Sequence, residues 1–291
     1  MIEINSYTTV KRRARVPHEV FAAYWRDVHG PLCSRLPGLG LYIQHHFSRA
    51  QDAHLWPLAD GITEIADYEL DGGVEIGFAN ADDQKRFQGA SPILFSDEQN
   101  MFDETLAYDL PNGSATVVNT LNDQTFNGTD RMDRIHIHFS PRNSLQQLND
   151  YLANDLANAL RQSEAVLKLR LHLSVPFNND GMHPPAPNVA HFANPNRAEL
   201  AMMEIAFETP LARRQFFESQ AFKDTLDGQA KQVAQLKAFA VSGLYTYVHE
   251  GQLTTAGLRG SRAAELIDYL GAVNQRKDDV EQLMLKGVLA G

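Results

Sequence analysis

Cysteine and long apolar runs are nearly absent from this sequence. Its 291 residues include a single cysteine, Cys33, which excludes an internal disulfide framework and a cysteine-based metal cluster. Residues 1–7 lack the basic start and apolar core of a signal peptide, and no stretch approaches about 18 uninterrupted apolar residues. We therefore expect a cytoplasmic protein that has no membrane partner.

Basic residues are also in short supply. The chain has 26 basic against 36 acidic residues, a net charge of −10, so nucleic acid is not expected as a partner. Phosphate-binding glycine loops and the Gly-x-Ser-x-Gly elbow of hydrolases are missing, since Gly38-x-Gly40 has no third glycine. Cys33 is interpreted as a small buried residue rather than a nucleophile.

The sequence does contain an internal repeat. The segment VEIGF at 74–78, followed nine residues later by Phe87, recurs as MEIAF at 203–207, followed nine residues later by Phe216. The order of expected elements supports the repeat, because each copy is preceded by a strand, a helix and a strand and is followed by a helix and a strand. The expected elements before the copies are 2–10, 17–27 and 41–47, and 134–139, 144–162 and 166–174; the final strands are 106–118 and 239–249.

This β-α-β-β-α-β order predicts the fold class. We expect an α+β protein of two tandem ferredoxin-like halves, at 1–120 and 131–252, whose bare sheet faces close into a pseudo-dimeric α/β barrel. A C-terminal helical tail is expected at 261–291, where it packs on the outside or on another copy in a homo-oligomer. The insertion at 175–197, rich in Pro, Asn and His, is interpreted as a lid or pocket wall.

Alternation along the strands predicts a polar barrel interior. Side chains of a strand point alternately to its two faces, so the apolar set is expected to meet the helices and the polar set to point inward. A solvated, inactive sheet face is the alternative. The expected inward set is Tyr42, Gln44, His46, Glu75, His136, His138, Lys168, Arg170, His172 and Glu204.

The first half contains a specific motif, Phe21-x-x-Tyr24-Trp25-x-x-x-His29-x-Pro31-Leu32. With Leu36-Pro37-Gly38-Leu39 and the strand at 42–46, it resembles the EthD family of the dimeric α/β-barrel superfamily. The resemblance covers about residues 2–118 and implies a small-molecule role without fixing a reaction. The second half lacks the motif, so any chemistry that it supports would occur once per chain.

His29 is the expected acid or base. It lies four residues after Trp25, on the same helical face, and we expect Pro31 to end the helix just beyond it. A neighbouring carboxylate, Asp27 or Glu75, could hold its tautomer. A helix C-cap is the alternative reading of His29. Tyr24 and His46 complete the expected catalytic set; the expected substrate-binding residues are Tyr7, Trp25, Tyr42, Gln44, His136, His138, Arg170, His172 and Glu204.

These features favour an acid/base enzyme that needs no cofactor. We expect a lyase, decarboxylase, cyclase or isomerase that acts on an aromatic or polyketide-like small molecule in the barrel interior. Two other classes stay open. One is a metal- or haem-dependent enzyme that uses the inward histidines, with His136, His138 and His172 as the expected metal ligands; the other is a binding protein without catalysis.

Overall fold

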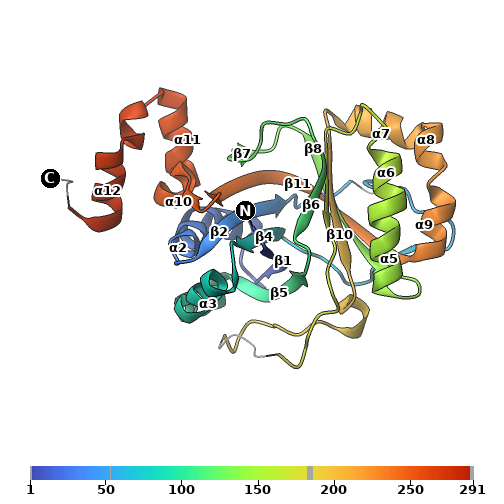
Figure 1. The fold of residues 1–291 in the computed structure, drawn as a ribbon, viewed down its shortest axis with the longest axis horizontal. Helices are drawn as coiled ribbons and strands as arrows, with labels where there is room; N and C mark the ends of the chain where they lie inside the picture. The colour runs from blue at the N-terminus through green and yellow to red at the C-terminus, as the bar shows by residue number, and fades with distance from the viewer. Residues whose placement is uncertain (1, 53, 182–185, 289–291) are drawn as a thin grey trace.

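The computed structural model describes residues 2–52, 54–181 and 186–288, and it confirms the expected α+β class. The first half begins with two strands separated by a helix, and two further helices follow the repeat strand (Figure 1). Its elements are β1 (Ile4–Arg12), α1 (His18–Tyr24), a π-helical turn (Trp25–His29), α2 (Gly30–Ser34), β2 (Leu39–Phe47), β4 (Gly72–Phe78), α3 (Ala81–Ala90), α4 (Pro92–Met101), β5 (Phe102–Leu110) and β6 (Ser114–Asn119).

The second half repeats this order. Its first helix again contains a π-helical turn, and its final strand is longer than that of the first half. Its elements are β8 (Asp133–Pro141), α5 (Leu145–Tyr151), the π-helical turn (Leu152–Leu156), α6 (Ala157–Leu160), β9 (Lys168–His172), a 3₁₀ turn (Pro195–Arg197), β10 (Ala201–Phe207), α7 (Pro210–Glu218), α8 (Gln220–Lys223), α9 (Leu226–Gln232) and β11 (Val233–His249).

The strands of both halves form one sheet. The strand order is β5-β1-β4-β2-β11-β8-β10-β9-β6, so each half has the ferredoxin-like arrangement and the halves meet through β2 and β11. The path begins at β5 and ends at β6, two strands separated in the chain by residues 111–113, and the sheet therefore closes on itself as a barrel. Three short strands, β3 (Thr63–Glu64), β7 (Asn127–Thr129) and β12 (Gln252–Leu253), also pair with β11.

The register gives the barrel an approximate two-fold symmetry. Tyr7 pairs with Glu75 across β1 and β4, and His136 pairs with Glu204 across β8 and β10. Each pair is therefore the counterpart of the other, and Tyr7 and His136 meet inside the barrel, where the Tyr7 hydroxyl lies 2.8 Å from His136 Nδ1.

The first helix continues past Pro31, so the expectation that Pro31 ends it is wrong. The Gly30 N–H bonds to the Trp25 carbonyl, five residues back, and α2 then starts with Pro31 in its first turn, where an N–H is not needed. Pro31 cannot donate to the carbonyl of Arg26, which instead accepts a hydrogen bond of 2.7 Å from the Tyr247 hydroxyl on β11. Gly30 is required here, because a Cβ would lie 2.5 Å from the Tyr247 ring.

Each half has an insertion that packs on the other half. Leu55, Trp56 and Ile62, from the first half, pack into the apolar layer between the second-half sheet and its helices. Ala186 and Val189, from the second half, pack into the corresponding layer of the first half. Each half therefore has its helical layer completed by a segment of the other.

The described part of the C-terminal tail contains α10 (Thr255–Arg259), α11 (Ser261–Leu270), a 3₁₀ turn (Val273–Arg276) and α12 (Asp278–Lys286). Helices α11 and α12 project from the barrel on the side away from α5–α9 (Figure 1). Tyr269 and Leu270 of α11 are 88% and 74% exposed. In the described parts of the chain, none of the helices is both long and apolar enough to cross a membrane.

We predict that Tyr247→Phe lowers the free energy of unfolding by about 1–3 kcal/mol, because the Arg26 carbonyl is left buried without a donor. Urea unfolding measures this loss. Tyr269→Phe removes the same atom from an exposed ring and should change stability by less than about 0.5 kcal/mol. Equal effects of the two substitutions would contradict this account of the π-helical turn.

Candidate active site

Strand β2 faces the opposite way from the sequence expectation. Tyr42, Gln44 and His46 point to the helices, not into the barrel: the His46 ring stacks on Trp25 with 4.2 Å between centroids, and Gln44 Nε2 donates to the Trp25 carbonyl. Pro31 provides a physical reason. It has no N–H to donate within the helix, and the carbonyls of Trp25 and Arg26 accept hydrogen bonds from Gln44 and Tyr247 on the neighbouring strands, unlike the second-half helix, where the same turn is not followed by a proline. The inward residue of this strand is His45, which the alternation rule had assigned to the helix side.

The barrel interior is polar, as expected, but its side chains fill it. The rings of His136, His138 and His172 are fully buried, and burial lowers the pKa of His138 to about 3 and that of His172 to about 4. Arg170 reaches Glu75 at 2.7 Å, and Arg134 pairs with Glu204. None of these residues lines the large cavity described below, and neither does Tyr7.

The expected metal trio does not form a ligand set. Both ring nitrogens of His138 face hydroxyl groups: Nε2 lies 3.2 Å from Tyr7 Oη, and Nδ1 lies 2.7 Å from Tyr68 Oη. His136 and His172 are therefore not joined by His138 around a common point. If the interior histidines bind a metal ion, they do so together with residues other than His138.

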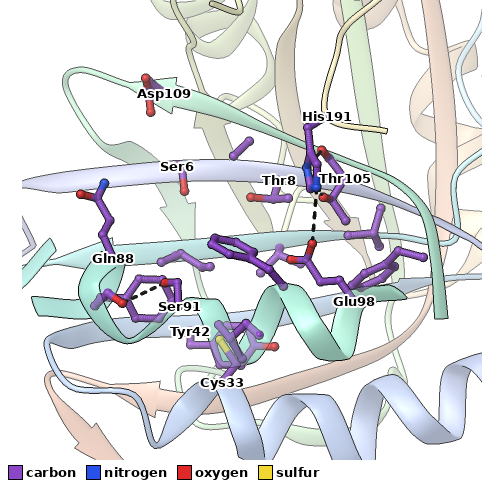
Figure 2. A pocket seen from close by; sticks show the side chains of 18 of the residues that line it. Ser6, Thr8, Cys33, Tyr42, Gln88, Ser91, Glu98, Thr105, Asp109 and His191 are labelled. Carbon is purple, nitrogen blue, oxygen red and sulfur yellow. Dashed lines mark hydrogen bonds and ion pairs between the residues drawn. The ribbon is translucent and has the colours of Figure 1, made fainter. Parts of the chain in front are cut away.

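The large cavity lies on the other side of the first-half sheet. It has a volume of about 720 Å³ and lies between the strands β1, β4 and β5 on one side and the helices α3 and α4 on the other, with the insertion at one end (Figure 2). Most of its wall is apolar, with Phe87, Leu94, Phe95 and Phe102 among the lining residues. Of the residues expected from the sequence, His29, Trp25 and Tyr42 line it.

The insertion after β9 forms part of the cavity wall, as the sequence led us to expect. Phe177 and His191 line the cavity. Arg197 anchors the segment to β5 through two hydrogen bonds to the carboxylate of Glu104, at 2.7 and 3.0 Å. Residues 182–185 of this insertion lie outside the described residues.

His29 is held by a carboxylate that the sequence analysis did not identify. Its Nδ1 lies 2.8 Å from Asp97 on α4, and the other oxygen of Asp97 accepts a 2.6 Å hydrogen bond from Tyr24. Burial would raise the pKa of Asp97, but the hydrogen bonds from His29 and Tyr24 outweigh it and lower that pKa. Asp97 is thus ionised and fixes the proton of His29 on Nδ1, which leaves Nε2 as the acceptor.

The carboxylates expected in this role are engaged elsewhere. Asp27 binds Arg26 at 2.6 Å and accepts a hydrogen bond from the backbone of Arg262, and Glu75 lies inside the barrel. Tyr24 contacts Asp97 and is not among the cavity-lining residues, so it positions the pair rather than facing the cavity.

Glu98, the next residue on α4, differs from Asp97 in its protonation state. Burial, and then the negative charge of Asp97, raise the pKa of Glu98 to about 8, so its carboxyl is protonated at neutral pH. Its Oε2 lies 3.8 Å from His191 Nε2, while His191 Nδ1 lies 3.0 Å from the Thr105 hydroxyl (Figure 2). Two adjacent carboxyl groups with pKa values shifted in opposite directions are typical of acid/base sites.

Cys33 lines the cavity but is not a nucleophile. Burial raises the pKa of its thiol to about 12, so the reactive thiolate is scarce at neutral pH. This placement agrees with its interpretation as a small buried residue.

The sequence analysis missed Asp97, Glu98 and His191. Asp97 and Glu98 lie on a helix expected only as a helical stretch, and their contacts with His29 and His191 join positions 68 and 93 residues apart in the chain. The one available signal was the pair of adjacent acidic residues in the helical stretch between the repeat strand and the β-prone segment.

Comparisons with known proteins show only distant structural similarity. No protein-family model and no curated protein sequence matches the chain, so the EthD resemblance stays a prediction. The chain is similar in structure to a provisionally assigned monooxygenase of Fusobacterium nucleatum (8% identity, TM-score 0.49, covering 86% of this chain and 96% of that chain). It is also similar to an anthrone oxidase-like protein (10%, 0.49, 87% and 96%). A dye-decolorizing peroxidase of Bacteroides thetaiotaomicron is more distant (12%, 0.41, 84% and 93%).

At these identities and TM-scores the similarities carry no argument about activity. The fold class rests on the strand order and register of the chain itself.

We predict that Glu98→Gln removes a pH dependence of stability. Between the ordinary carboxyl pKa of 4.5 and the raised value of about 8, the folded protein keeps a proton that the unfolded chain has lost. The free energy of unfolding therefore falls as pH rises through this window, by up to about 1.4 kcal/mol per pH unit for this one group. Urea unfolding from pH 5 to 8 measures the slope.

The control for this prediction is Glu208→Gln, which replaces an exposed carboxyl in the same chain. Its slope should equal that of the wild type, whereas the slope of Glu98→Gln should be flatter. If both variants keep the wild-type slope, Glu98 is ionised in the folded protein.

Proposed function

We propose that the protein is an enzyme that moves a proton on an aromatic or polyketide-like small molecule bound in the 720 Å³ cavity. The observation that carries this proposal is the pair of adjacent carboxyl groups on α4 whose pKa values are shifted in opposite directions. Asp97 is ionised and holds His29, while Glu98 is protonated and faces the cavity. The cavity thus has both a proton acceptor and a proton donor.

The roles follow from the contacts. His29 Nε2 is the base, because Asp97 keeps the other ring nitrogen protonated and stabilises the imidazolium that forms. Glu98 is the acid, which donates its proton to a developing enolate or phenolate oxygen or returns a proton to carbon. Tyr24 is a positioning residue, since its hydroxyl fixes the orientation of Asp97.

The cavity favours a mostly apolar ligand with a few polar groups. A volume of about 720 Å³ lies within the range of roughly 300–1,000 Å³ typical of small-molecule sites. The ring of Phe102 lies 5.7 Å from that of His29, so a flat aromatic substrate would meet both aromatic and catalytic groups. The reaction is therefore of the lyase, decarboxylase, cyclase or isomerase type, which a single acid/base pair can support.

The alternative of a haem-dependent enzyme that uses the inward histidines does not fit this arrangement. The interior histidines are fully buried against one another and line no part of the large cavity. A binding protein without catalysis would use the same cavity, and it is the outcome that the following experiment separates from catalysis.

We predict that the protein exchanges an acidic C–H of its ligand with solvent deuterium. A panel of hydroxylated aryl ketones and 1,3-diketones, followed by NMR in deuterated buffer, measures this exchange. His29→Asn and Glu98→Gln should each slow it by about 10²–10⁴-fold, the contribution typical of one acid or base. A control variant, Ser96→Ala, changes an exposed residue of α4 that does not line the cavity, alters no charge, and should keep the wild-type rate.

Binding is measured separately in Trp56→Phe, which leaves Trp25 as the only tryptophan. Trp25 lines the cavity, whereas Trp56 packs in the second-half core, so ligand entry should change the fluorescence of Trp25. Saturable binding of panel members without enzyme-dependent exchange would show a binding protein. No binding of any member would contradict the proposed ligand class.

A further inference from the structure

A second group of chemically active side chains lies inside the barrel, away from the cavity. His45 of β2 and His136 of β8 meet there ring to ring, with 3.2 Å between His45 Nδ1 and His136 Nε2. Glu204 of β10 completes the group, and its ligand atoms all lie within 4.8 Å of one another. The three residues come from both halves and are at most 1% exposed.

The separation of the two nitrogens suits a common metal ion. Two imidazole nitrogens at about 2.0–2.1 Å from a tetrahedral ion lie roughly 3.3 Å apart. The observed 3.2 Å matches this separation. A direct hydrogen bond between the two rings is the other arrangement with this distance, so further observations have to separate them.

Unpartnered buried atoms supply the first such observation. Glu204 Oε2 and His172 Nε2 are both buried and, among the described residues, have no hydrogen-bond partner. Arg134 occupies the other oxygen of Glu204, Oε1. Because an unsatisfied buried carboxylate oxygen is costly, its presence beside two imidazole nitrogens favours a cation bound at this point.

The outer contacts of the two histidines supply the second observation. The Tyr7 hydroxyl lies 2.8 Å from His136 Nδ1, and Glu75 Oε1 lies 3.4 Å from His45 Nε2. Metal-bound histidines generally have their second nitrogen held by a carboxylate or another polar group in this way. Each histidine therefore has one nitrogen held from outside and one directed to the shared point.

The charge of the surrounding cluster also favours a cation. Apart from its histidines, the buried ion-pair cluster contains four carboxylates against three cationic side chains, an excess of one negative charge. The carboxylates are Asp123, Asp130, Glu75 and Glu204, and the cations are Arg134, Lys168 and Arg170.

We propose that the barrel interior binds one first-row divalent cation through His45, His136 and Glu204. Two imidazoles and one carboxylate, with no thiolate, suit zinc, cobalt or iron rather than calcium or magnesium. His172 and Glu204 also belong to a second group, with Glu75, whose ligand atoms lie within 4.8 Å of one another. The site is independent of the cavity chemistry, because none of its three ligands lines the cavity.

We predict that the protein acquires about one equivalent of metal per chain when it is synthesised in medium supplemented with zinc or cobalt. Supplementation during synthesis is needed because the ligands are sealed once the barrel closes. Metal analysis gives the stoichiometry, and the visible absorption of bound cobalt reports nitrogen and oxygen ligation. His136→Asn should lower the metal content by at least about tenfold.

The matched control is His46→Asn, next to His45 on β2 and also buried, whose ring stacks on Trp25 on the helix side of the sheet rather than facing the site. It should retain the metal. If His136→Asn is insoluble, anomalous diffraction from wild-type crystals grown from zinc-loaded protein locates the ion instead. Metal-free wild-type protein from zinc, cobalt, manganese and iron media, or metal found away from His45 and His136, would overturn the proposal.

Discussion

The ion pair between Arg170 and Glu75 joins the two halves at the centre of the molecule. Glu75 lies on β4 of the first half and is 1% exposed, while Arg170 reaches it from β9 of the second half. A carboxylate in such a dry place requires a matched charge, and the cost of separating the pair is several kcal/mol. Because the partners come from different halves, this requirement fixes how the two sheets face each other and how the barrel closes.

The same closure divides the protein into a filled half and a hollow half. In the second half, Leu148, Leu152, Phe216 and Phe222 fill the layer between sheet and helices as a continuous apolar core. In the first half, the corresponding layer contains the cavity with His29 and Glu98. The repeat is thus symmetric in its strands and asymmetric in what lies above them, in agreement with a signature motif that occurs once.

The sequence predicted the order of helices and strands well, but it predicted which strand side chains point into the barrel correctly only for some strands. On β8 and β9 the alternation of Ile and Leu with His and Arg gave the correct inward residues, because the helices there pack on the sheet mainly through apolar side chains. On β2 the same rule failed, since Gln44 lies on the helix side, where it donates to the Trp25 carbonyl. That turn, and hence the true end of the helix, depends on Tyr247, more than 200 residues away, which no local pattern can indicate.

Only one residue of the proposed acid/base group could be identified from the sequence. The motif identified His29, but Asp97 and Glu98 become significant only when α4 is folded over the sheet. The position of the cavity, outside the barrel rather than within it, follows from the volumes of side chains such as Tyr7 and Tyr68, which occupy the interior beside His138. Sequence patterns describe which face a residue takes and not how much space remains there.

The exchange of insertions has a consequence for how this chain can change over time. The segment with Trp56 belongs to the first half but stabilises the second, and the segment with His191 belongs to the second half but shapes the cavity of the first. Neither half could therefore be inherited separately and still supply its own missing wall. The two copies change as one unit, because a substitution in the insertion of one copy alters the layer between sheet and helices of the other.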